Sequence, residues 1–173
     1  PMRLEVGRLA PGFIPDASWK KARFHQPWYQ GETLNMAIGQ GYLLVTPLEI
    51  LRLTAIIAKD GRVVDPHLVA SEGSFPRERP RVAIKEQHLK VIKQAMLQVV
   101  QSDYGTGQLA RVDFEKLAGK TGTAQTPHKK AHSWMTGFFP YKEPKLAFLV
   151  FVELGGPAGL TRPSLVKQML ESW

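Results

Sequence analysis

The segment Gly119–Gln125, which reads Gly-Lys-Thr-Gly-Thr-Ala-Gln, combines residue types that can hold an anionic ligand. Lys120 supplies a positive charge, since a lysine with its reference pKa of about 10.4 is protonated at neutral pH unless it is buried. The hydroxyls of Thr121 and Thr123 can donate hydrogen bonds to a carboxylate. Gly122 lets a ligand approach the backbone closely, and an outward-facing N–H of the same strand can stabilise an oxyanion. On a strand that lines a cleft, these residues would bind a carboxylate. An ordinary turn is the alternative for so short a motif.

A second possible chemistry is nucleophilic catalysis by a serine. Ser18 and Lys21 satisfy the spacing Ser-x-x-Lys. On a helix this spacing places a serine one turn from a lysine, which is the geometry of a nucleophile and its general base. The chain has no cysteine, so thiolate catalysis, disulfides and cysteine-type zinc sites are excluded.

The histidines offer little support for a metal site. His128 and His132 are four residues apart, as a helical zinc pair would be, but Pro127 precedes them and no glutamate completes the pattern His-Glu-x-x-His. A zinc site also needs third and fourth ligands, which the sequence does not offer nearby. We therefore expect solvated loop histidines, no metal and no cofactor.

The chain is basic, with 23 Lys and Arg against 15 Asp and Glu, a net charge of +8. Such a surplus attracts polyanions, which include nucleic acid, anionic membrane surfaces and acidic polymers. The basic residues cluster at Lys20–Arg23, Arg77–Arg81 and Lys129–Lys130, but aromatic residues do not interleave with them as in nucleic-acid-binding motifs. We expect a solvated basic face and no nucleic acid. A basic, non-catalytic binding module for nucleic acid or an acidic cell-envelope polymer remains the alternative.

The elements that position these residues begin with an irregular region. Residues 1–40 carry several proline turns, and we expect loop with at most a short helix over Ser18–Arg23. Thr46-Pro47-Leu48-Glu49 then has the capping-box pattern of a helix start. The helix that follows is apolar almost all round, which predicts burial in a core. Gly61 is expected to end it in a left-handed conformation.

The second half of the sequence predicts a helix, two strands and a final helix. Apolar residues recur at helical spacing from Leu89 to Val100, and Tyr104–Gly107 breaks that pattern. The periodicity then changes, and two strands, Ser133–Phe139 and Leu146–Leu154, are joined by a hairpin-length loop. The second strand is apolar on both faces, so we expect it inside a covered sheet. Pro163 starts the last helix, with Leu165, Val166, Met169, Leu170 and Trp173 as its apolar stripe. The order predicts an α+β fold with helices packed on an antiparallel sheet.

Several motifs, taken in order, resemble one family. Trp28–Gly41 reads Trp-Tyr-Gln-Gly-Glu-Thr-Leu-Asn-Met-Ala-Ile-Gly-Gln-Gly, and Thr46–Glu49, Gly119–Gln125, His132–Pro140 and Gly155-Gly156 follow it. Together they resemble the transpeptidase domain of a class B penicillin-binding protein, of the penicillin-binding protein 2 type. Lys-Thr-Gly is an element of penicillin-binding proteins and β-lactamases. The resemblance covers essentially the whole chain, and one departure from it is Leu160-Thr161-Arg162-Pro163 in place of a run of small residues.

The resemblance implies that residues 1–173 are the C-terminal portion of the transpeptidase domain, a half-domain with three strands of its sheet and its last helix. The family's Ser-x-x-Lys motif lies far upstream of the Trp-Tyr segment, whereas Ser18 comes shortly before Trp28, so we interpret Ser18 as a chance match. Asn35 is the only asparagine and residue 33 is threonine, so the Ser-x-Asn motif is absent too. The portion that carries the nucleophile is therefore expected to lie outside this chain.

The activity implied by the resemblance is that of a serine D,D-transpeptidase, which cross-links peptidoglycan stem peptides through an acyl-enzyme and binds penicillin. Lys120, Thr121, Gly122 and Thr123 would hold the carboxylate end of the peptide or the β-lactam antibiotic, and the Thr123 N–H would help stabilise the oxyanion. The parent enzyme would be anchored by an N-terminal helix at the periplasmic face of the bacterial inner membrane, beside other elongation-complex membrane proteins. This chain alone is expected to be inactive. A non-catalytic docking piece of the same fold is the third possibility.

Overall fold

The computed structural model describes residues 3–4, 7–8, 10–64, 66, 68, 79–127, 130–156 and 161–172. Its centre is a three-stranded antiparallel sheet in the order β5-β6-β7, which confirms the predicted α+β class and hairpin. The strands are β5 (Ala118–Ala124), β6 (His132–Phe139) and β7 (Leu146–Val152). The other elements are β1 (Arg3–Leu4), β2 (Gly7–Arg8), α1 (Ala17–Phe24), α2 (Gln30–Ala37), α3 (Pro47–Ala58), β3 (Arg62–Val63), β4 (Arg79–Arg81), α4 (Glu86–Gln101), the 3₁₀ helix η1 (Gln108–Ala110) and α5 (Thr161–Glu171).

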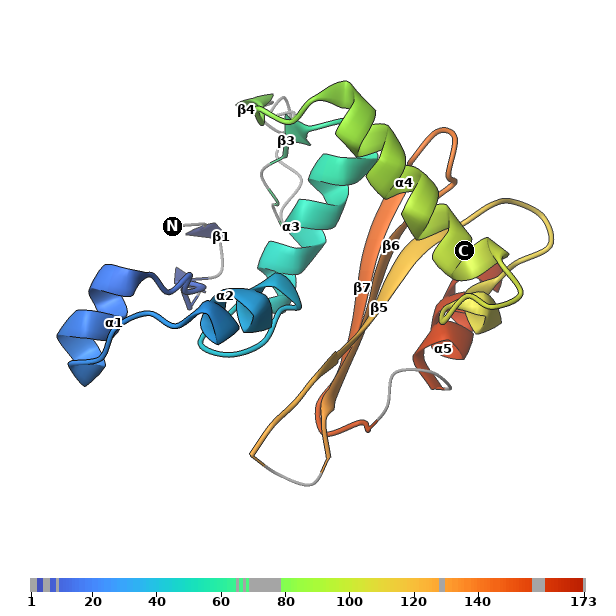
Figure 1. Cartoon of the computed structure of the whole chain (residues 1–173). Helices are drawn as coiled ribbons and strands as arrows, with labels where there is room; N and C mark the ends of the chain where they lie inside the picture. Colours follow the sequence, from blue (N-terminus) through green and yellow to red (C-terminus); the bar gives the residue numbers. More distant parts are fainter. Residues whose placement is uncertain are drawn as a thin grey trace.

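Helices cover both faces of this sheet (Figure 1). The helices α3 and α5 lie on opposite sides of the strands, and α4 runs beside β5. On the α5 face, buried residues of α4, η1, the sheet and α5 form the larger core cluster. On the α3 face, Ala58, Met96, Ala118 and Phe138 form the smaller one. The larger cluster consists of Val100, Ala110, Val112, Leu117, Met135, Phe139, Phe148, Val166 and Leu170.

Helix α3 begins as the capping box predicts. The Thr46 hydroxyl accepts a hydrogen bond from the Glu49 N–H at 3.2 Å, and the Glu49 carboxylate accepts one from the Thr46 N–H at 2.8 Å. The same carboxylate accepts the Gly12 N–H at 3.0 Å, so the helix start also holds the incoming chain. The helix ends at Ala58. After the cap residue Lys59, both Asp60 (φ 54°) and the predicted Gly61 (φ 87°) are left-handed, a conformation that costs glycine least.

The expected complete burial of α3 is wrong for the described residues. Thr54 and Ala58 are buried, but Leu53 is 51% exposed, and most of the other apolar side chains of this helix are half-buried. One side of the helix packs on β6 and β7, where the hydroxyls of Thr54 and Thr136 are 2.7 Å apart. Because a single sheet can cover only one side of a helix, an apolar pattern all round does not guarantee burial on every side.

Glu49 gives the fold a testable pH dependence. The Thr46 N–H, helped by the Gly12 N–H, holds the pKa of the Glu49 carboxyl below its ordinary value of 4.5. The stabilisation is therefore complete above pH 4.5 and is lost as the pH falls through the lowered value. We expect Glu49→Gln to lower the free energy of unfolding by roughly 1 kcal/mol at pH 7, since hydrogen bonds to a charged group are replaced by weaker ones.

Urea denaturation of the two proteins at pH 7 and at pH 3 measures this effect. The difference between wild type and Glu49→Gln should shrink at the acid pH, because the Glu49 carboxyl takes up its proton more readily in the unfolded chain than in the folded one. Glu143→Gln, at an exposed position of the 140–144 loop, serves as the control with little change at either pH. A difference that grows on acidification would contradict the assignment.

The other predicted helices are also present. In α4, Leu89, Met96 and Val100 are buried as the spacing predicts, although Ile92 is 38% exposed. The break after α4 has a steric reason at Gly105, where a Cβ atom would lie 2.2 Å from the Val99 carbonyl oxygen. In α5 the predicted stripe is only partly buried. Val166 and Leu170 are in the core, Leu165 is 42% and Met169 37% exposed, and Trp173 lies outside the described residues.

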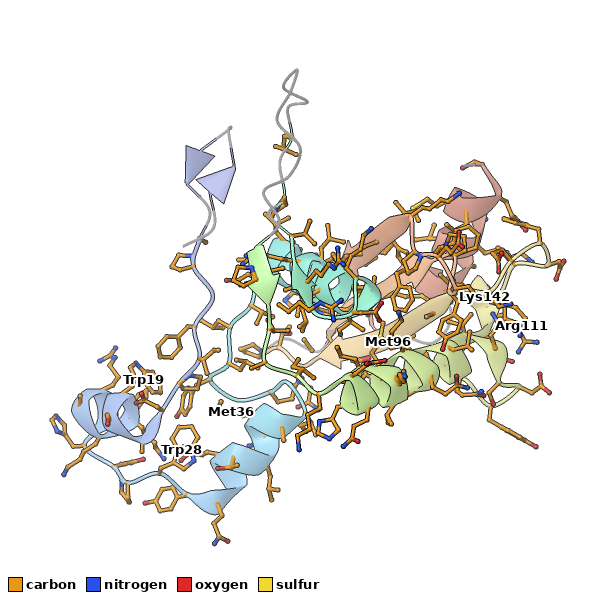
Figure 2. The ribbon with its side chains drawn as sticks, turned by 90° about the horizontal axis from the view of Figure 1, so that it is seen from above. Trp19, Trp28, Met36, Met96, Arg111 and Lys142 are labelled. Atoms are coloured by element: carbon orange, nitrogen blue, oxygen red, sulfur yellow. The ribbon has the colours of Figure 1, made fainter. Side chains whose placement is uncertain are left out.

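The interpretation of residues 1–40 as loop with one short helix is wrong in part. The helix α1 confirms the expected one, but a second helix, α2, follows directly. The Glu32 carboxylate accepts the Tyr29 N–H at 2.7 Å at the start of α2, and this cap gives no signal in a search for Ser, Thr, Asp or Asn before a helix. Figure 2 shows Trp19, Trp28 and Met36 in this region, well apart from Met96 and Arg111 around α4.

The strand β7 differs from its prediction in two respects. A helix packs on each of its faces, α3 on one and α5 on the other, but the cover is partial. Only Phe148 of this strand is buried, and Phe151 is 37% exposed. The strand also lies at the edge of the sheet and not inside it, because β6 is its only partner strand among the described residues. Within the same residues, no helix has the length and apolar character needed to cross a membrane.

Candidate functional site

A groove of about 760 Å³ runs along the outer edge of β5. One wall is the loop that follows α2, residues 38–41 and 43–45, together with Ile50 of α3. The other wall is formed by β5 and the residues after it, together with residues of β6. The groove contains every predicted binding residue and is lined on the β side by Lys120, Thr121, Gly122, Thr123, Ala124, Gln125, Thr126, Pro127, His132, Trp134 and Thr136.

The side chains of β5 alternate between the two faces of the sheet. Lys120 pairs with Thr136 and Gly122 with Trp134, so these positions lie on the α3 face. Thr121 and Thr123 lie on the opposite face. Thr121 is buried, whereas Lys120 and Thr123 are exposed. Because both faces meet at the open edge of the strand, a ligand lying along that edge can reach the lysine and both threonines.

The backbone of β5 also faces this edge at alternate residues. Gln40 of the loop donates from Nε2 to the Thr123 carbonyl oxygen at 3.4 Å and accepts the Gln125 N–H through Oε1 at 3.3 Å. In a strand the N–H and the C=O of one residue point to the same side, and alternate residues share that side. The Thr123 N–H therefore points away from β6 and toward the groove. It is a backbone donor directed toward the groove, and oxyanion holes are built from donors of this kind.

The Lys120 ammonium group lies at the same edge. Its Nζ donates to the Thr121 carbonyl oxygen, so a positive charge is held beside the two threonines. A charge in this place attracts a carboxylate and strengthens the hydrogen bonds that the carboxylate accepts.

The hydroxyl of Thr121 has a partner outside the sheet. It lies 2.7 Å from the hydroxyl of Thr106, in the turn between α4 and η1. This contact fixes the orientation of a side chain that the sequence predicts to bind a ligand.

Close packing surrounds Gly122. A Cβ atom at this position would lie 3.3 Å from the Trp134 Cβ, and the Trp134 ring in turn packs on Phe151 with centroids 4.4 Å apart. A side chain at residue 122 would crowd this aromatic floor of the groove, so glycine keeps the groove open beside the lysine.

The serine-lysine pair of the sequence lies elsewhere. Ser18 and Lys21 are exposed on α1, which lies away from β5 in both figures. The neighbouring Lys20 is buried and paired with Glu32 at 2.5 Å, and this hydrogen bond holds the pKa of the Glu32 carboxyl below its usual range. Asn35 lies on α2, where its carbonyl oxygen accepts the Gln40 N–H at 2.8 Å. These residues shape the region after α1 and bring no nucleophile to the groove.

The remaining candidate residues are the histidines and the basic clusters, which the sequence raised for a metal site and for a nucleic-acid-binding surface. His132 accepts the Leu154 N–H through Nδ1 at 3.1 Å, and His128 lies outside the described residues. No group of three or more His, Asp or Glu side chains that can hold a metal ion occurs in the described part of the chain. Of the basic clusters, Arg77 and Lys129 lie outside that part, and Lys20 is taken up by its ion pair.

Two residues that contact the predicted binding strand were missed by reasoning from the sequence, Gln40 and Thr106. Gln40 stands between two glycines of the Trp28–Gly41 segment, and Thr106 stands in the predicted break after α4. A polar residue flanked by glycines signals a turn but does not reveal what its side chain will meet.

The comparisons with known proteins agree on one family. The family model "Penicillin binding protein transpeptidase domain" matches residues 11–171. The peptidoglycan D,D-transpeptidase MrdA of Haemophilus influenzae is 32% identical over 99% of this chain, which spans 30% of that protein. Penicillin-binding protein 2 of Pseudomonas aeruginosa, in complex with WCK 5153, is 33% identical with a TM-score of 0.83, over 94% of this chain and 36% of that one. The Helicobacter pylori complex of penicillin-binding protein 2 and MreC matches at 34% identity and a TM-score of 0.81, over 93% and 31% of the two chains.

These matches extend over nearly the whole chain and include its groove. The chain spans about 30% of the length of the curated relatives. It belongs to the penicillin-binding protein transpeptidase domain family, and within that family to the penicillin-binding protein 2 (MrdA) type.

Proposed function

We propose that this chain is the C-terminal portion of the transpeptidase domain of a peptidoglycan D,D-transpeptidase, and that its β5 edge holds the substrate. The observation that carries the proposal is the convergence of Lys120, Thr121 and the outward Thr123 N–H on one groove. A cation, a hydroxyl and a free-edge N–H match the terminal carboxylate and the developing oxyanion of a D-Ala-D-Ala peptide.

In the proposed reaction the nucleophile is a serine in the remainder of the domain. Its hydroxyl oxygen attacks the carbonyl carbon of the penultimate D-Ala, the peptide C–N bond breaks, and the terminal D-Ala leaves with the proton that the serine loses. The amine of a second stem peptide then attacks the ester, a new peptide bond forms, and the serine hydroxyl is regenerated with a proton from that amine. Penicillin acylates the same serine by opening of its lactam ring. Within this chain, Lys120, Thr121 and Thr123 hold the carboxylate, and the Thr123 N–H stabilises the oxyanion.

A larger domain is supported by the apolar surface around the groove. Leu34 is 70% exposed, Ile38 73% and Leu44 62%, and Leu53 lies on the uncovered side of α3. Exposed apolar residues gathered in one region mark a surface that another part of a protein covers. We propose that the N-terminal portion of the domain, which carries the serine, packs on this surface.

The setting of the whole protein is proposed from its relatives. The curated relatives act on peptidoglycan by name, and the Helicobacter pylori relative forms a complex with MreC. We therefore place the parent protein at the periplasmic face of the inner membrane, held by an anchor outside this chain and in contact with other membrane proteins of cell elongation.

Mass spectrometry after incubation with penicillin tests the proposed function. We expect the full-length protein to gain the mass of one penicilloyl group on a serine outside residues 1–173, and the 173-residue chain alone to gain none. An adduct on Ser18 of this chain would overturn the assignment of the nucleophile. Failure of the folded full-length protein to react would overturn the proposed activity.

The contact between Thr106 and Thr121 leads to a further prediction. If the Thr106 hydroxyl donates to Thr121, the proton of Thr121 is left to bind the ligand carboxylate. Thr106→Val removes that donor and should lower the second-order rate constant of penicillin acylation roughly threefold to tenfold, the value of one hydrogen bond. Thr106→Ser keeps the hydroxyl and should react like wild type. Equal rates for the valine and serine variants would show that the contact has no part in binding.

A further inference from the structure

We propose that Gln40 is a positioning residue that aligns the end of β5 for oxyanion stabilisation, an inference that rests on the proposed function. Its side-chain amide bonds the Thr123 carbonyl oxygen and the Gln125 N–H, 3.4 and 3.3 Å away, although 85 residues separate Gln40 from Gln125. The amide Nε2–H of Gln40 donates to a carbonyl oxygen of β5, and its Oε1 accepts a backbone N–H two residues further along. This is the pattern that the backbone of a neighbouring strand would present to the same edge.

The loop holds Gln40 in place for this role. The Gln40 N–H donates to the Asn35 carbonyl oxygen at 2.8 Å, and the Gly39 N–H donates to that of Met36 at 2.9 Å. The flanking Gly39 and Gly41 have φ values of 74° and 76°, a conformation that costs a glycine little and other residues more. The backbone of Gln40 is thus fixed to the end of α2, and its half-buried side chain connects this helix to β5.

The proposed function of the Gln40 contact depends on the Thr123 N–H, which the Gln40 amide does not bind. By binding the backbone on both sides of Ala124, Gln40 fixes the peptide planes that follow Thr123 without occupying the Thr123 N–H. That N–H keeps its direction toward the groove, where a developing oxyanion would lie. Such a donor contributes only if it is already oriented when charge develops, because reorientation during the reaction reduces its benefit. Gln40 therefore acts through Thr123 and does not touch the reacting atoms.

The test compares wild type with Gln40→Ala in the full-length protein. Acylation by penicillin is followed at increasing concentrations, which separates the dissociation constant of the initial complex from the first-order acylation rate constant. We expect the rate constant to fall about tenfold, the effect of weakening one transition-state hydrogen bond, while the dissociation constant changes less than about twofold. The same full-length variant should show faster hydrogen exchange at the Gln125 amide, with the Gly122 amide, which faces β6, unchanged.

Controls separate this role from loss of folding and from failure of the proposed function. Gln30→Ala, at an exposed position of α2, should leave both constants unchanged. A folding defect would lower the fraction of protein that reacts and not its rate constant. Acylation of Gln40→Ala at the wild-type rate would overturn the role of Gln40 alone. A wild-type protein that penicillin does not acylate would overturn the proposed function, and with it this inference.

Discussion

Lys120→Ala in the full-length protein is expected to lower the second-order rate constant of penicillin acylation roughly 10- to 100-fold, the range for loss of a charge-assisted hydrogen bond. The change removes the positive charge that the proposed carboxylate meets. It also removes the hydrogen bond from Nζ to the Thr121 carbonyl oxygen, so the strand edge loses part of its fixed geometry. Labelling with a fluorescent penicillin at several concentrations gives the rate constant.

Lys116→Ala is the matched control for this experiment. Lys116 is an exposed lysine just before β5, and it lies outside the residues that line the groove. Its removal lowers the net charge by the same amount, so any general electrostatic attraction of the antibiotic falls equally in both variants. If Lys116→Ala slowed acylation as much as Lys120→Ala, overall charge and not a specific contact would explain the effect.

Gly137→Ala is expected to produce the largest loss of stability among glycine-to-alanine substitutions in the sheet. A Cβ atom at Gly137 would lie 2.3 Å from the Ala118 carbonyl oxygen of β5 and 2.6 Å from the Phe148 ring of β7. The first contact is with backbone, so it can be relieved only by separating β5 from β6, and the second presses on a buried ring. We expect a loss of roughly 3 kcal/mol or more, at the upper end of the range for overpacking.

Gly31→Ala tests the same substitution where space is open. A Cβ atom at Gly31, on α2, would meet nothing within 4 Å. Alanine is the better helix former, so this variant should match wild type or gain up to about 1 kcal/mol. Urea denaturation of both variants gives the comparison. A stability near the wild-type value in Gly137→Ala would mean that the packing of β6 between its neighbours is looser than described.

Local signals in the sequence predicted the elements that depend on neighbouring residues. The start of α3 follows from Thr46 and Glu49, whose mutual hydrogen bonds span only three residues. The exposed side of α3 could not be predicted from the sequence. An apolar pattern indicates that a helix is covered, but it does not show which segment covers each side. The helix α2 was missed for a related reason. It begins after Tyr29, and Gly31 and Asn35 are weak helix formers.

The residues of the candidate site could be predicted from the sequence, but the contacts that orient them could not. Lys120, Thr121 and Thr123 were singled out by the Lys-Thr-Gly motif together with the ordered motifs around it, and their charge and hydroxyls then suggested the kind of ligand. Gln40 and Gln125 are 85 residues apart, and Thr106 and Thr121 are 15 apart, so these pairs exist only once the chain has folded.

The crystal structure of the full-length protein after acylation by penicillin is the most direct measurement of how this groove is used. The penicilloyl carboxylate should lie within hydrogen-bond distance of the Thr121 and Thr123 hydroxyls and near the Lys120 ammonium, with the acyl carbonyl oxygen on the Thr123 N–H. A carboxylate bound elsewhere, with the acyl group turned away from β5, would contradict the account.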